Sequence, residues 1–179
     1  MKLKGSKTEQ NLRTAFSGES EARNKYTYFA SQARKEGFVQ IANILEETAN
    51  NEKEHAKIWF KILHDDKMPD TKECLKLAAQ GEHYEWAEMY KGFSETAKEE
   101  GFDRIAFLFS EVGKIERQHE ERFNTLLANV TSNKVFAKEN KVLWICTNCG
   151  HTHEDNKALE ICPVCSHPQA YFEIKSFNY

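Results

Sequence analysis

Proline, glycine and long apolar runs are scarce in this sequence. Of its 179 residues, 3 are proline and 8 are glycine, so few positions would interrupt an α-helix. No run is apolar enough for a signal peptide or a membrane span, and a net charge of −3 gives no reason to expect nucleic acid or an anionic membrane as a partner. A Gly-x-Gly-x-x-Gly motif is absent, so we expect no nicotinamide nucleotide to bind this chain. These absences predict a cytoplasmic protein with long helices.

Cysteines are few but concentrated. Cys74 stands alone, whereas the other four form two pairs, Cys146-x-x-Cys149 and Cys162-x-x-Cys165. In a cytoplasmic chain two such pairs predict a tetrahedral metal site rather than disulfides. The spacing fits zinc as well as iron, so a structural zinc ribbon is an alternative to a redox-active iron. We expect the lone Cys74 to be packed as a small apolar residue.

The prolines also mark a division of the chain. Pro69 is the one proline before residue 140, whereas Pro163 and Pro168 lie among the paired cysteines. Helical periodicity gives way to short alternating apolar pieces at residues 135–142. The sequence therefore predicts a helical domain, residues 1–140, and a small β domain, residues 141–179, that depends on its metal to fold.

Four long amphipathic helices are predicted in the first domain, at about residues 6–36, 38–63, 75–100 and 102–130. A capping box, Ser6-x-x-Glu9, marks the start of the first helix. The two helix pairs repeat, because a shift of 64 residues superposes Tyr26 on Tyr90 and one Glu-x-x-His motif on the other. Short turns within each pair and a longer connection between the pairs predict an all-α four-helix bundle of the ferritin-like kind.

The apolar stripes of these helices contain carboxylates and imidazoles. Seven such residues lie near the middles of the helices: Glu19, Glu52, His55, Glu82, Glu85, Glu116 and His119. A buried carboxylate without a partner is costly, and no lysine or arginine lies in the stripes to pair with it. Protonation or a bound cation remains, and seven converging ligand-type side chains favour metal. Glutamates from two helices with Glu-x-x-His from two others are the pattern of di-iron carboxylate bundles.

The charges of such a centre do not cancel. Two ferrous ions carry +4 and the five glutamates carry −5, so one carboxylate is in surplus. We infer that one glutamate leaves the metal or carries a proton during turnover, which suits a redox site. Tyr26 and Tyr90 are either core aromatics or hydrogen-bond donors to the ligating carboxylates. We expect His83 at the surface or close to the ligands, and Glu120 on a solvated helix face.

With these residues assembled, the chain closely resembles the rubrerythrin family, in which a ferritin-like di-iron bundle precedes a rubredoxin-like domain. The resemblance covers almost the whole length and rests on GESEARNKY, EKEH, GEHYEWAEMY, ERQHEERF, CTNCG and CPVCSHPQAYFE. It implies that Glu52 and Glu116 bridge two irons. Glu19 would bind the first iron, and Glu82 with His119 the second.

The resemblance also implies which residues act in catalysis. One iron would move between Glu85 when oxidised and His55 when reduced, with Tyr26 and Tyr90 close to the ligands. A third, mononuclear iron would be held by the four paired cysteines: Cys146, Cys149, Cys162 and Cys165. Ser166 departs from the family, since rubredoxin-like domains usually have a small residue such as glycine there.

The activity that the resemblance implies is the reduction of hydrogen peroxide to water, as protection against oxidative stress. Electrons would come from NAD(P)H through a separate reductase or rubredoxin and pass through the four-cysteine iron. A homodimer, head-to-tail or domain-swapped, would bring that iron beside the partner's di-iron site. Two alternatives are an iron-oxidising or storage protein, and a zinc-ribbon binding module attached to an inert bundle.

Overall fold

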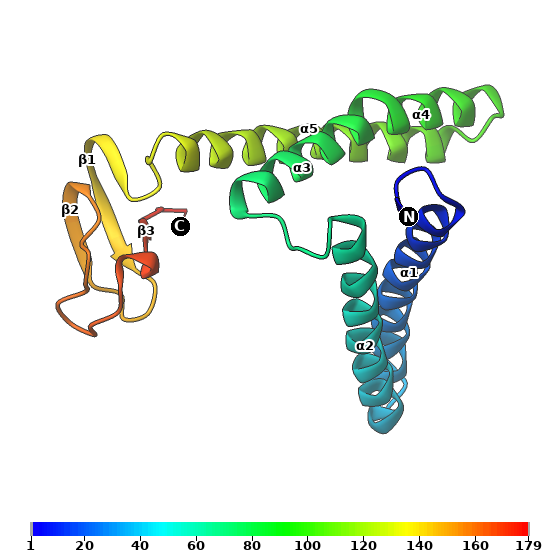
Figure 1. Cartoon of the computed structure of the whole chain (residues 1–179), viewed down its shortest axis with the longest axis horizontal. Coiled ribbons are helices and arrows are strands. Elements are labelled where there is room, and N and C mark those ends of the chain that lie inside the picture. The colour runs from blue at the N-terminus through cyan, green and yellow to red at the C-terminus, as the bar shows by residue number, and fades with distance from the viewer. Residues whose placement is uncertain (1, 179) are drawn as a thin grey trace. The chain divides into compact units, whose positions relative to one another are not determined.

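The computed structural model describes residues 2–178. The chain divides between Pro69 and Asp70 into two compact units, which we describe separately. Helices dominate, and a small antiparallel sheet follows them at the C-terminal end (Figure 1), which confirms the predicted combination of a helical fold with a C-terminal β region. Within residues 2–178, every helix is too short or too polar to cross a bilayer.

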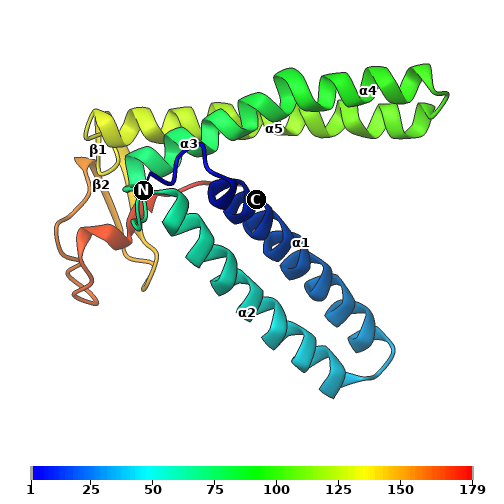
Figure 2. The same ribbon diagram turned by 45° about the vertical axis from the view of Figure 1, so that its right-hand side comes forward.

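The first unit is a hairpin of two long helices, α1 (Lys7–Lys35) and α2 (Val39–Leu63), which run side by side in Figure 1 and Figure 2. The helix α1 begins where the capping box predicts, because the backbone N–H of Glu9 donates a 3.1 Å hydrogen bond to Ser6 Oγ. The turn between the helices passes through Gly37, whose φ of +87° suits glycine.

Small side chains line the contact between α1 and α2. The buried residues of the two helices are all alanines: Ala30, Ala33, Ala42, Ala49 and Ala56. Larger apolar residues of the predicted stripes, such as Phe29 and Ile41, are exposed. The hairpin by itself therefore does not bury its apolar stripe.

The second unit begins with a longer hairpin. Its elements are α3 (Thr71–Tyr84), the π-helical turn η1 (Glu85–Met89), α4 (Tyr90–Glu99) and α5 (Asp103–Thr131). The third predicted helix thus starts four residues earlier than expected, because Asp70 caps it by accepting a 2.9 Å hydrogen bond from the Glu73 N–H. That helix is also interrupted by a π turn, which periodicity did not predict.

A three-stranded antiparallel sheet follows α5. Its strands are β1 (Ala137–Cys146), β2 (Thr152–Lys157) and β3 (Phe172–Ile174), in the order β2-β1-β3, and a 3₁₀ turn, η2 (Gln169–Tyr171), precedes β3. Trp144 is fully buried beside Cys146 and Cys162. Its indole N–H donates a 3.0 Å hydrogen bond to the Asp155 carbonyl, so the largest core side chain has its polar atom satisfied.

Candidate metal centres

A first cluster of ligand-type side chains lies on the α1–α2 hairpin. Glu19 comes from α1, and Glu52 and His55 lie one turn apart on α2. His55 Nδ1 is 2.8 Å from Glu52 Oε2 and 3.8 Å from Glu19 Oε2. Both carboxylates are half-buried, whereas His55 is exposed. Each residue offers a ligand atom within 4.8 Å of the others, so the three can bind one metal ion.

A second cluster repeats this geometry on the α3–α5 hairpin. His119 Nδ1 is 2.8 Å from Glu116 Oε2 and 3.8 Å from Glu82 Oε2. All three side chains are half-buried, and their ligand atoms again lie within 4.8 Å of one another. The sequence repeat is therefore a repeat of ligand geometry as well.

Electrostatic repulsion is evident in the second cluster. Burial and the neighbouring carboxylate of Glu116 raise the pKa of Glu82, and Glu85 adds to the effect. Burial also raises the pKa of Tyr90, with further contributions from the same three carboxylates. A bound cation would relieve this repulsion, and carboxylate oxygens and imidazole nitrogens are ligands that iron accepts. The residues present thus fit a carboxylate–histidine iron site.

The seventh predicted ligand, Glu85, opens the π turn η1. The backbone N–H of Tyr90 donates to the Glu85 carbonyl, five residues earlier, as in a π-helix. A π turn contains one residue more than an α-helical turn, and the sequence repeat reveals that residue. Eight positions separate Glu82 from Tyr90, but only seven separate Glu19 from Tyr26.

The inserted residue sets the alignment of the two hairpins. Before it, a shift of 63 places Glu82 on Glu19; after it, the shift is 64. With the shift of 63, the counterpart of Glu85 in the first hairpin is Ala22. The additional carboxylate is therefore present only in the hairpin that contains the π turn.

Tyr26 and Tyr90 are both half-buried. The Tyr26 ring lies 6.3 Å from that of Phe29, and the Tyr90 ring lies 6.4 Å from Phe93 and 6.0 Å from Phe109. Tyr90 thus packs against two phenylalanine rings and also interacts electrostatically with the carboxylates of Glu82, Glu85 and Glu116.

Sequence patterns missed a polar cluster beside these ligands. Glu120 was expected on a solvated face, but its side chain is only 20% exposed and accepts a 2.6 Å hydrogen bond from Trp86 Nε1. His83 Nδ1 lies 3.1 and 3.2 Å from the two Glu120 oxygens. The bond from Trp86, and then that from His83, lowers the pKa of Glu120. The one signal in the sequence was that His83 and Trp86, three residues apart, share a helix face.

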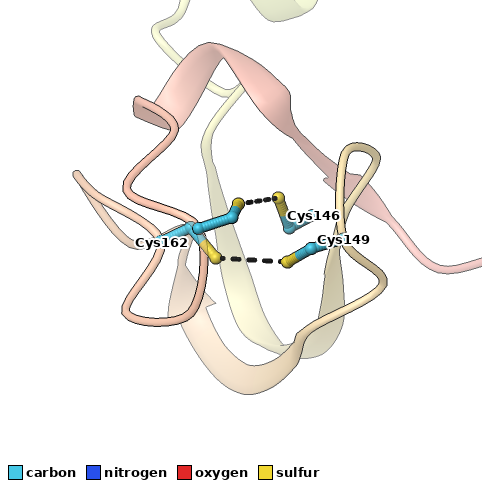
Figure 3. A group of neighbouring side chains, drawn as sticks. Cys146, Cys149 and Cys162 are labelled. Atoms are coloured by element: carbon cyan, nitrogen blue, oxygen red, sulfur yellow. Dashed lines mark hydrogen bonds between the residues drawn. The ribbon is translucent and has the colours of Figure 1, made fainter.

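The four paired cysteines converge in the β region. Figure 3 shows Cys162 facing Cys146 and Cys149. Sulfur atoms of Cys146 and Cys165 are 3.7 Å apart, and those of Cys149 and Cys162 are 3.6 Å apart. A metal bonded to four sulfurs at about 2.3 Å in a tetrahedron gives sulfur–sulfur edges of about 3.8 Å. The four thiols therefore fit one tetrahedral metal ion.

Two similar loops present these thiols. Gly150 N–H donates a 2.8 Å hydrogen bond to the Cys146 carbonyl, and Ser166 N–H donates one of 2.9 Å to the Cys162 carbonyl. Gly150 has a φ of +77° and Ser166 a φ of +58°. Ser166 thus adopts the left-handed conformation that favours glycine.

Backbone N–H groups favour negative charge on two of the sulfurs. Donation from the His167 N–H lowers the pKa of Cys165 to about 6. The His151 N–H likewise favours the thiolate of Cys149, but desolvation and the three neighbouring sulfurs outweigh it and raise the pKa of Cys149 to about 12. The four sulfurs share thiol protons through the hydrogen bonds between them. A bound metal ion would replace these protons, because cysteine binds metal as the thiolate.

Comparisons with known proteins agree with these two kinds of site. A family model described as rubrerythrin matches residues 10–127, and a model described as the rubredoxin-like domain of rubrerythrin matches residues 144–173. Rubrerythrin-1 of Clostridium acetobutylicum is 47% identical, over 99% of this chain and 98% of that protein. Rubrerythrin of Porphyromonas gingivalis is 47% identical, over 99% and 94%. Rubrerythrin of Clostridium perfringens is 48% identical, over 96% of each. The domain boundary at residue 140 stays a prediction.

Proposed function

The chain belongs to the rubrerythrin family, and from this premise we propose that it is a non-haem di-iron peroxidase that reduces hydrogen peroxide to water. The observation that supports this most is the presence, in one chain, of two matching Glu/His clusters and a separate four-thiolate site. An iron pair held by the two Glu/His clusters would supply two-electron reduction of the O–O bond, and an iron held by the four cysteines would supply one-electron transfer.

The irons would be held by side chains of both hairpins. We assign to the di-iron centre the residues Glu19, Glu52, His55, Glu82, Glu85, Glu116 and His119. Exposed apolar residues on each hairpin, such as Phe29 and Phe93, support the packing of one hairpin against another into a four-helix bundle. That packing would bring a first cluster and a second cluster together as one di-iron site. The two clusters have the same His–Glu distances, 2.8 and 3.8 Å.

Protons are needed as well as electrons. Reducing one hydrogen peroxide molecule to two water molecules consumes two protons and two electrons. Tyr90 has a phenol O–H that can donate a hydrogen bond at the site, and burial and the nearby carboxylates raise its pKa further above its ordinary value. Five ionised carboxylates would carry −5 against +4 from two ferrous ions. If Glu85 is protonated, four carboxylates remain ionised and the centre is neutral.

Electrons would arrive from another protein. The chain has no Gly-x-Gly-x-x-Gly motif, so we assign the oxidation of NAD(P)H to a separate reductase. We propose a homodimer, in which the four-thiolate iron of one chain serves the di-iron site of its partner. The four thiols suit a reducing compartment, so we place the protein in the cytoplasm.

Metal analysis combined with rapid mixing tests this function. We expect about three irons per chain, and we expect the reduced protein to react with hydrogen peroxide at least about tenfold faster than with dioxygen. In a Cys162→Ser variant the first oxidation by peroxide should persist, whereas repeated turnover with an electron donor should stop. Cys74→Ser, the same change at a cysteine outside the four-thiolate site, should leave both unchanged.

Other outcomes would contradict the proposal. Zinc at the four cysteines with no reaction with peroxide would indicate a zinc-ribbon binding module. A faster reaction with dioxygen than with peroxide, with iron accumulating beyond three per chain, would indicate an iron-oxidising or storage protein.

A further inference from the structure

Glu120 joins three structural elements next to the second cluster. It lies on α5, immediately after His119, and it accepts hydrogen bonds from Trp86 at 2.6 Å and from His83 at 3.1 Å. His83 lies near the end of α3 and Trp86 lies in the π turn, so the two donors flank Glu85 in the sequence. Glu120 therefore ties both sides of Glu85 to α5.

Ring contacts also hold Trp86 in place. The rings of His83 and Trp86 lie edge to face, with centroids 5.2 Å apart. The Arg117 guanidinium lies 5.6 Å from the Trp86 ring centroid, within cation–π range. Glu120 is half-buried, and its two carboxylate oxygens lie within 3.2 Å of His83 Nδ1, while one of them also accepts from Trp86 Nε1. Trp86 is thus fixed by its indole N–H and by its ring.

The first hairpin provides an internal comparison. With the shifts that superpose the ligands, the counterparts of His83, Glu85 and Glu120 are Ser20, Ala22 and Ala56: three small residues in place of three polar ones. Ala56 is buried against α1, and the first hairpin has no π turn among its described residues. The polar cluster, the π turn and the additional carboxylate therefore occur together, in one hairpin only.

A π turn needs such a restraint. The extra residue of a π turn can move along a helix, and moving it by one position rotates the intervening side chain by about 100° around the helix axis. A rotation of that size would aim Glu85 away from Glu82 and Glu116. The hydrogen bonds on either side of Glu85 oppose that movement.

We propose that Glu120 is a positioning residue for Glu85: by accepting hydrogen bonds from His83 and Trp86, it fixes the π turn that aims the Glu85 carboxylate at the metal centre. This inference rests on the proposed role of Glu85 as an iron ligand. It adds a function for a residue that contributes no ligand atom to either cluster.

The experiment compares Glu120→Ala, Glu85→Ala and the double variant in the full chain. Iron retention is measured by competition with a chelator, and Mössbauer spectra of the iron-loaded protein record the surroundings of each iron. We expect Glu120→Ala to lower the affinity for one iron of the pair about 10- to 100-fold, as is usual when a group that orients a ligand is lost. The double variant should be no weaker than Glu85→Ala, because Glu120 acts through Glu85.

A second measurement does not depend on iron. Hydrogen exchange of the metal-free chain should be faster in Glu120→Ala over residues 82–90, by about tenfold for a net loss of about 1.4 kcal/mol. Glu120→Gln retains an acceptor for Trp86 and should restore part of both effects. Glu54→Ala removes an exposed carboxylate that is also next to a histidine ligand, so it is the matched control and should change neither measurement.

The outcomes separate this inference from the proposed function. If Glu85→Ala retains all its iron with an unchanged spectrum, the assignment of Glu85 as a ligand is wrong. If Glu85→Ala loses iron but Glu120→Ala does not, or if the losses add in the double variant, Glu120 does not position Glu85. If Glu54→Ala and Glu120→Ala had equal effects, the cause would be the loss of one negative charge near the site, and the proposed positioning role of Glu120 would be wrong.

Discussion

The approach of α4 to α5 leaves little space for a side chain at Gly113. A Cβ added there would lie 3.3 Å from the Cβ of Tyr90, whereas a Cβ added at Gly92, on α4, would meet no atom within 4 Å. Both glycines are inside helices, so both replacements by alanine gain the same helix propensity. We therefore expect Gly92→Ala to stabilise the protein and Gly113→Ala not to do so.

The magnitudes follow from the two local environments. Alanine is favoured over glycine inside a helix by about 0.8–1.0 kcal/mol, which sets the gain for Gly92→Ala. Non-bonded carbons are most stable at about 3.5–4.0 Å, so at Gly113 the Tyr90 Cβ must withdraw by a few tenths of an ångström. Because a Cβ is attached to the backbone, α4 itself has to move. Overpacking of this kind costs about 1–3 kcal/mol, so Gly113→Ala should range from neutral to about 2 kcal/mol destabilising.

Urea unfolding of the iron-loaded chain, followed by far-ultraviolet circular dichroism, gives the comparison. Equal slopes against urea in all three proteins would show that the midpoints report stability. The rate of peroxide reduction should also fall in Gly113→Ala, since Tyr90 is displaced from the carboxylates. An equal gain in stability from both substitutions, with unchanged activity, would refute the argument from the Tyr90 contact.

Three further predictions concern the metal sites and the first helix. Cys162→Ser should reduce the iron content from about three to about two per chain, and its visible absorption should lose the sulfur-to-iron bands of the four-thiolate site. His55→Ala and His119→Ala should affect iron retention unequally in the oxidised and reduced states, because only the His119 hairpin carries the additional carboxylate Glu85; equal losses in both states would contradict this. The hydrogen bonds from Arg13 and then from the Gly5 N–H lower the pKa of Glu9, so its contribution is present above its unfolded-state pKa and disappears as the pH falls through its lower folded-state pKa. Glu9→Gln should therefore be less stable than the unchanged chain at pH 7, and the difference should shrink as the pH falls through the lowered pKa of Glu9, as judged by urea unfolding of the metal-free protein.

The sequence was sufficient to predict residues that repeat. Glu52 and His55 recur 64 positions later as Glu116 and His119, and a buried carboxylate needs a partner, so both clusters could be predicted before any geometry was known. The start of α3 was placed too late because apolar periodicity begins only after Thr71, whereas the N-cap signal Asp70-x-x-Glu73, which marks the true start, is itself present in the sequence.

The π turn and the role of Glu120 were harder to predict. Glu82 matches Glu19 at a shift of 63, whereas the other repeated ligands match at a shift of 64, so the sequence indicates one inserted residue. This difference does not say where in the helix the extra residue lies. Glu120 follows a ligand on a charged helix, and most such carboxylates are solvated. The 2.6 Å bond from Trp86, the contact with His83 and a side-chain exposure of only 20% distinguish Glu120 from such carboxylates.

The two hairpins differ least where they bind metal and most beside it. Their His–Glu distances are the same, 2.8 and 3.8 Å. Two irons held by these clusters alone would therefore have equivalent surroundings. A redox centre that takes up two electrons one at a time and passes them together to a single substrate is served by inequivalent irons. Such an inequality would have to come from residues outside the repeat, and the residues we propose for it are Glu85 on the π turn and Glu120, which accepts hydrogen bonds on both sides of it. On this proposal, one inserted residue and a few polar substitutions in one hairpin would make two otherwise matching metal clusters inequivalent.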